Sequence, residues 1–220
     1  MTDNPFIFDS EDTPYLKHHY QEKCWYRGKE SIDVNYFMID PDTMLMGWGK
    51  YTSGEGYSYV WQKDLFTNIA KPDDEYKKAF SVWVLPKFVN DKDNITHPVS
   101  LWQRHSFGEY KGFQEMGASF FAETQKPENA GKLPVVKYTG SESISIGKGS
   151  TSIPHFEFVG MKDRPTEFVV PDWYNESPSD NQQHDFLPKS DGDTQDEAKN
   201  FNAFEAVSYT HLTLPTTVFV

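Results

Sequence analysis

Little in the sequence points to catalysis, to a membrane or to disulfide bonding. The 220 residues include one cysteine, Cys24, which cannot form an internal disulfide and is typical of a protein in a reducing cytosol. No apolar run approaches the roughly 18 residues that a membrane-spanning helix needs. The N-terminus lacks a basic stretch followed by an apolar one, so no secretory signal is expected. These absences predict a cytoplasmic protein without membrane contact.

Motifs for metals and catalysis are also missing. His18, His19 and Cys24 lack the further spaced ligands of a zinc site, and we expect them to be surface residues. Acidic residues at 191–197 lack the glycine and glutamate positions of a calcium loop. The glycine pairs do not have the spacing of a phosphate-binding loop. The sequence therefore predicts no enzyme, no cofactor and no metal.

The negative charge is concentrated at the two ends of the chain. The whole chain has a formal net charge of −12. Residues 1–15 carry four acids and no base, and residues 171–220 carry nine acids against two bases, which leaves −1 for residues 16–170. We expect an acidic N-terminal arm (1–15), a core domain (16–170) and an acidic disordered tail (171–206). A nearly neutral core can still present a basic face to a polyanion.

The core carries the signals of a mainly β fold. Aromatic residues make up 16% of the chain, which argues against disorder throughout. Aromatic residues at helical spacing predict one helix over 112–124, laid against a sheet. Pro86 suggests an edge or a bulge in its strand. Two architectures fit, a compact OB-like barrel or a curved sheet with one packed helix. The expected strands are 32–39, 43–51, 57–61, 79–89, 133–138, 143–146 and 155–159.

Aromatic and cationic residues alternate along several of these strands. Single-stranded nucleic acid is bound by rings that stack on bases and by cations that follow the phosphates. Because side chains alternate with period two, Tyr57, Tyr59 and Trp61 are expected on one face, and Trp48 and Lys50 on a common face. A β protein also needs large aromatics in its core, and that alternative stays open. The candidate nucleic-acid-binding residues are Trp48, Lys50, Tyr57, Tyr59, Trp61, Lys63, Lys87, Trp102 and Arg104.

The acidic tail suggests a second interaction. Phe201 and Phe204 lie within it and are candidates for docking partner proteins, such as replication proteins. A plain solubilising tail is the alternative. In layout, a β-rich core followed by an acidic tail with aromatics resembles the single-stranded-DNA-binding proteins of phage replication modules.

A second resemblance covers roughly residues 40–168. It is to a set of uncharacterised tailed-phage and prophage proteins, although Met161 stands where those relatives tend to have Trp. The resemblance implies a phage origin and little about activity. The matching stretches are Gly47-Trp48-Gly49-Lys50, Gly131-Lys132-Leu133-Pro134-Val135-Val136, Gly147-Lys148, Ile153-Pro154-His155-Phe156 and Arg164-Pro165.

The charge-free end of the chain, residues 207–220, differs from everything before it. Residues 207–217 resemble a translated sequencing adaptor, so we expect a non-native extension that plays no part in the fold. A strand over 213–220 that adds to a sheet edge is the alternative.

These features together predict a non-catalytic phage protein that binds single-stranded DNA as a replication accessory. A phage virion or tail structural protein, using the same aromatics at subunit interfaces, is the alternative. The sequence does not predict an oligomeric state.

Overall fold

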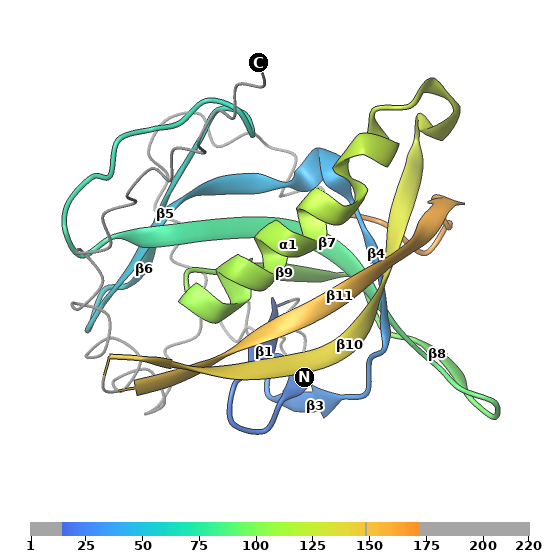
Figure 1. Cartoon of the computed structure of the whole chain (residues 1–220), viewed down its shortest axis with the longest axis horizontal. Helices are drawn as coiled ribbons and strands as arrows, with labels where there is room; N and C mark the ends of the chain where they lie inside the picture. The colour runs from blue at the N-terminus through green and yellow to red at the C-terminus, as the bar shows by residue number, and fades with distance from the viewer. Residues whose placement is uncertain (1–14, 148, 172–220) are drawn as a thin grey trace, which may run out of the picture.

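The computed structural model describes residues 15–171 except 148. Within them, one α-helix lies across a mixed, curved sheet of eleven strands (Figure 1). The prediction of a mainly β fold with one packed helix is confirmed. The sheet does not close, so the OB-like barrel was wrong and the curved sheet was right. Residues 1–14 of the expected N-terminal arm, residues 172–206 of the acidic tail with Phe201 and Phe204, and the 207–220 extension lie outside the described residues, whereas Tyr15 of the expected arm begins the first strand.

The bounds of the elements follow the chain in order. They are β1 (Tyr15–His19), β2 (Cys24–Arg27), β3 (Glu30–Ile32), β4 (Tyr36–Ile39), the 3-10 turn η1 (Pro41–Thr43), β5 (Leu45–Thr52), β6 (Gly56–Trp61), β7 (Lys77–Val89), β8 (Asn94–Thr96), β9 (Ser100–Arg104), α1 (Phe107–Thr124), η2 (Pro127–Asn129), β10 (Lys132–Ile146) and β11 (Gly149–Asp163).

Strand β7 is the centre of the sheet, because it has two successive neighbours along each edge. β5 and β4 pair with its first and second halves on one edge, and β9 and β8 do so on the other. Pro86 lies where β8 and β9 are interrupted, and its carbonyl accepts a hydrogen bond from His97 N–H at 3.0 Å. In an antiparallel strand, the C=O and N–H of one residue point to the same edge. The N–H that Pro86 lacks would therefore point into the gap between β8 and β9.

The remaining strands extend the sheet from these neighbours. β1 pairs parallel with β9, and β2 and β3 come next in the sheet after β1. β10 and β11 form a long hairpin beside β4. β6 pairs with β5. The predicted strands 133–138 and 143–146 are a single strand, β10, with register shifts between Val135 and Val136 and between Tyr138 and Gly140. The predicted strand 32–39 is interrupted at 33–35.

The two faces of the sheet have different cores. The inner face packs against α1, through Phe80, Val82 and Val84 of β7 and Phe113 of the helix. The outer face is the opposite one, where Trp83, Leu85 and Leu101 are covered in part by Phe168. The helix lies close to β11, because Gly108 and Gly112 face the backbone of Ser152 and Pro154.

Candidate nucleic-acid interface

Three aromatic rings form a stacked row on the outer face of β6, and this row is here called the aromatic ladder. Tyr59 and Trp61 lie 5.0 Å apart between ring centroids with planes 5° from parallel. Tyr57 and Tyr59 lie 6.3 Å apart with planes at 14°. The shared face follows the period-two alternation expected from the sequence. All three side chains are partly exposed.

Glycines in the neighbouring strand make room for the ladder. Gly49 pairs with Tyr59, and Gly47 pairs with Trp61. A Cβ atom at Gly49 would lie 2.7 Å from the ring of Tyr59, so a side chain there would push this ring away. Tyr59 and Trp61 can therefore lie close to β5, because β5 has no side chain at the two positions opposite them.

His105 joins the ladder from the end of β9. Its ring meets Tyr57 at 5.4 Å and Tyr59 at 6.2 Å, both edge to face. Burial lowers the pKa of His105 to about 3, and the nearby Arg104 and Lys77 add to this effect. Burial also raises the pKa of Tyr59. At neutral pH the imidazole and the phenol are therefore uncharged, and sequence reasoning missed His105 because it is distant in the chain from 57–61.

Trp48 and Lys50 lie on the opposite face of the β5–β6 hairpin. The register pairs them with Val60 and Ser58, not with ladder residues. Lys78 Nζ lies 4.0 Å above the Trp48 ring, and the indole donates a hydrogen bond to Ile69 O at 3.1 Å. The ring is thus occupied in holding the loop after β6. Trp48 and Lys50 share a face, as expected, and that face is not the one that carries Tyr57, Tyr59 and Trp61.

Lys50 is neutralised by that same loop. Its Nζ lies 3.1 Å from Asp73 and 3.5 Å from Glu75, and 4.9 Å from the ring centroid of Tyr76. The ion pair with Asp73 raises the pKa of Lys50. A cation already paired with two carboxylates is poorly suited to a phosphate.

Trp102 and Arg104 point to the inner face and are committed to a buried carboxylate. Trp102 is 1% exposed, so it cannot stack on a base in this structure. Its indole donates to Glu109 Oε2 at 2.7 Å, and Arg104 Nε donates to Oε1 at 2.9 Å. His18 N–H also donates to Glu109, at 3.2 Å. These bonds tie β1 and β9 to the first turn of α1, which is a structural role.

The other two predicted cations lie apart from each other. Lys63 is exposed and follows the ladder by two residues. Lys87 lies near the far end of β7, where its Nζ is 3.6 Å from Glu167. The structure thus brings Tyr57, Tyr59 and Trp61 together, with Lys63 two residues beyond Trp61 in the chain, and it separates Trp48, Lys50, Lys87, Trp102 and Arg104 from them.

No family model, curated protein or solved structure matches this chain. The ladder therefore has to be interpreted from its own chemistry. In the described part of the chain, no helix is long and apolar enough to cross a membrane.

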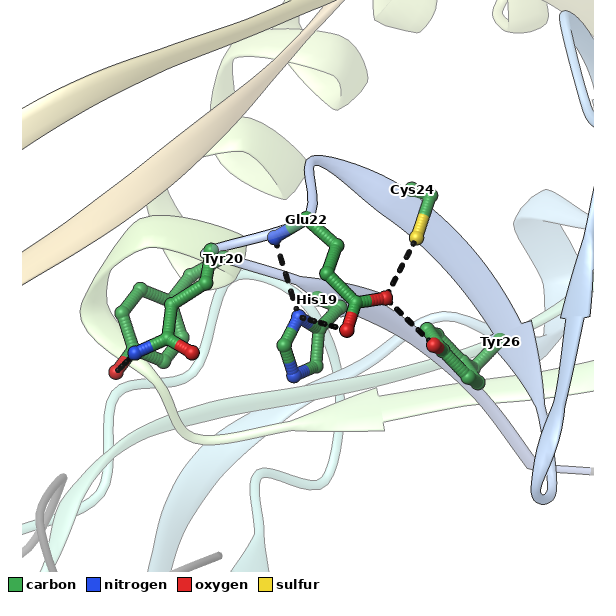
Figure 2. A network of polar contacts seen from close by, with 6 residues as sticks. His19, Tyr20, Glu22, Cys24 and Tyr26 are labelled. Carbon is green, nitrogen blue, oxygen red and sulfur yellow. Dashed lines mark hydrogen bonds and ion pairs between the residues drawn. The ribbon is translucent and has the colours of Figure 1, made fainter.

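A separate polar network surrounds the cysteine on the β1–β2 hairpin (Figure 2). Glu22 accepts hydrogen bonds from Tyr26 at 2.6 Å and from Cys24 at 3.5 Å, and His19 Nδ1 accepts one from Glu22 N–H at 3.2 Å. Burial, with the Glu22 carboxylate, raises the pKa of Cys24, which leaves the thiol protonated and unreactive. Among the described residues, no group of three His, Cys, Asp or Glu side chains is arranged to hold a metal.

The expectation that His18 is a surface residue was wrong. It is 4% exposed, not a surface residue, because it alternates with His19 along β1 and points into the aromatic core. Its Nε2 lies 3.1 Å from the hydroxyl of Tyr138. Burial lowers the pKa of His18, so the ring stays neutral in the core.

Proposed function

We propose that this protein binds single-stranded DNA without chemistry of its own, by stacking bases on the aromatic ladder. The observation that supports this is the row of nearly parallel, partly exposed rings on one face of β6. Stacking on aromatic side chains contributes about 1–3 kcal/mol per base, so one or two accessible ring faces give useful affinity.

Trp61 is the strongest stacking candidate. Tyr59 has a ring on each side of it in the ladder, so its own faces are largely covered. Tyr57 is also in contact with Tyr51 and His105. Among the described residues, Trp61 has a ring contact on one side only, with Tyr59, so its other face is the one that suits a base.

The electrostatics favour binding through bases more than through phosphates. Lys50, Arg104 and Lys87 are each paired with a carboxylate. The ladder histidine is neutral, since burial lowers its pKa to about 3. Each phosphate neutralised on a single strand contributes a slope of about −0.7 to the dependence of log affinity on log salt concentration. With Lys63 as the exposed predicted cation, we expect a shallow slope of about −0.7.

The experiment is a fluorescence titration of the full chain with a poly-dT oligonucleotide at two salt concentrations. Stacking on Trp61 quenches tryptophan fluorescence, and the shallow salt slope separates this ladder from a phosphate-binding groove. Absence of quenching at low salt, with folding confirmed by circular dichroism, rejects the proposal.

The cellular setting forms part of the same proposal. The resemblances of the sequence favour phage replication in the host cytoplasm, with Phe201 and Phe204 of the tail docking replication proteins. A phage virion or tail structural protein is the second candidate. It is supported by the position of the ladder on β6, whose outer edge is not paired with another strand among the described residues.

A further inference from the structure

In the described part of the chain, the edge strand β6 has no charge, proline or bulge that would keep it from pairing. Natural proteins protect edge strands with charges, proline, bulges or very short length. The sequence of β6, Gly56–Trp61, contains no charge and no proline. Its six pairs with β5 run without a register shift, and in the described part of the chain it pairs with β5 alone.

The other edges of the sheet are protected. β3 and β8 have three residues each, and β3 begins with a charged residue, Glu30. β11 has a register irregularity at Val159, because Phe158 and Gly160 pair with consecutive residues of β10. β6 lies beyond β5, on the same edge of β7 as β4 and the hairpin β10–β11, and is a regular edge strand of six residues (Figure 1).

The backbone of β6 presents its hydrogen-bonding groups at a defined set of residues. Gln62 N–H donates to Met46 O at 2.8 Å, which makes the even-numbered residues the ones whose backbone groups face β5. Hydrogen-bonded residues alternate along an antiparallel strand. The backbone N–H and C=O groups of Tyr57, Tyr59 and Trp61 therefore point to the outer edge.

We propose that the chain forms a two-fold dimer in which β6 pairs antiparallel with β6 of a second copy. With Tyr59 opposite the partner's Tyr59, odd-numbered residues pair with odd-numbered ones, as the outward backbone groups require. This register places Glu55 opposite the partner's Lys63, and Lys63 opposite the partner's Glu55. Both side chains are exposed just beyond the ends of β6, Glu55 in the turn before it and Lys63 in the bend after it.

Charge selects this register over its neighbours. Shifting the pairing by two residues in either direction keeps the backbone pattern but puts Glu55 or Lys63 opposite an aromatic ring. Directly opposed side chains lie on the same face of a sheet. The ladders of the two copies therefore lie side by side on one face, related by the two-fold axis, so the partner copy contributes rings to the same face.

The test is sedimentation equilibrium of the full chain without DNA, with charge reversals at the two strand ends. The wild type is expected to be a dimer. Glu55→Lys and Lys63→Glu each replace two attractive pairs by repulsive ones and are expected to raise the dimer Kd roughly tenfold. The double variant, Glu55→Lys with Lys63→Glu, restores the pairs with inverted sign and is expected to recover the wild-type Kd.

A matched control uses an exposed cation elsewhere. Lys92→Glu, in the turn between β7 and β8, is expected to leave the dimer Kd unchanged. The proposal is overturned if the wild type stays monomeric, if both single reversals dimerise like the wild type, or if the double variant is no better than the single ones. Because no DNA is present, none of these outcomes depends on the proposed function.

Discussion

Two glycines of α1 offer a matched test of how the helix is packed. Gly112 faces β11, and a Cβ atom there would lie 2.5 Å from Pro154 O and 2.8 Å from its Cγ. At Gly117, five residues later, a Cβ atom would meet nothing within 4 Å. The same substitution by alanine therefore differs at these two positions only in what the added methyl group contacts.

The expected energies have opposite signs. In a helix interior, alanine is about 0.8–1 kcal/mol more favourable than glycine, and Gly117→Ala should gain up to this amount. Gly112→Ala has the same gain, but α1 must move away from a backbone oxygen, which disturbs the packing of Phe113 and Met116. Overpacking of this kind costs about 1–3 kcal/mol. We expect Gly112→Ala to lose about 1–2 kcal/mol net.

The assay is equilibrium unfolding in urea, followed by tryptophan fluorescence, for both variants and the wild type. The midpoint should fall for Gly112→Ala and rise for Gly117→Ala, with little change in the slope of the transition. Equal stability of the two variants would refute the close contact between α1 and β11.

Three further predictions concern titration and burial. The pKa of His105 is about 3 in the folded protein, whereas its ordinary value is 6.5. As the pH falls, the unfolded chain therefore takes up a proton on this residue before the folded protein does. The free energy of unfolding should thus decrease as the pH drops from 6.5 toward 3. The loss is at most about 5 kcal/mol, and solvent reduces it because the ring is only partly buried. The stability difference between wild type and His105→Phe in urea should therefore change over this pH range. Glu109→Ala leaves the guanidinium of Arg104 without its buried carboxylate and should cost about 3–5 kcal/mol, whereas a loss below 1 kcal/mol would show that the network is not buried. Phe168 is 3% exposed, and Phe168→Ala should lower the free energy of unfolding by about 3–5 kcal/mol. Phe66 is 77% exposed, and Phe66→Ala should leave the stability almost unchanged. Thermal unfolding of both variants measures the difference.

Local patterns predicted the strands and the shared face of the ladder. The alternation of Tyr57, Tyr59 and Trp61 lies within one strand, so the period of two was sufficient to place the rings together. The helix was also found from its spacing, although it begins at Phe107, five residues before the expected start. The spacing did not predict the first turns of the helix, because they contain Gly108 and Gly112, and glycine is a poor helix former. These glycines let the helix pack closely on β11.

Contacts between residues far apart in the chain could not be predicted from the sequence. Lys50 meets Asp73 across 23 positions, and nothing in the local pattern shows that this cation is neutralised. Trp102 has the same aromatic–cation spacing as Trp48 with Lys50, yet it lies in the core because β9 has sheet neighbours on both edges and α1 covers its inner face. His105 joins the ladder only through the fold.

The central claim is that Trp61 of the ladder stacks on bases, and one measurement tests it most directly. Fluorescence anisotropy of a labelled poly-dT oligonucleotide gives the Kd of wild type, Trp61→Ala and the control Phe66→Ala, an exposed aromatic away from the ladder. Loss of one stacking ring is expected to raise the Kd by about 5-fold to 150-fold, while the control stays at the wild-type value. Equal Kd values for all three folded proteins would contradict the account.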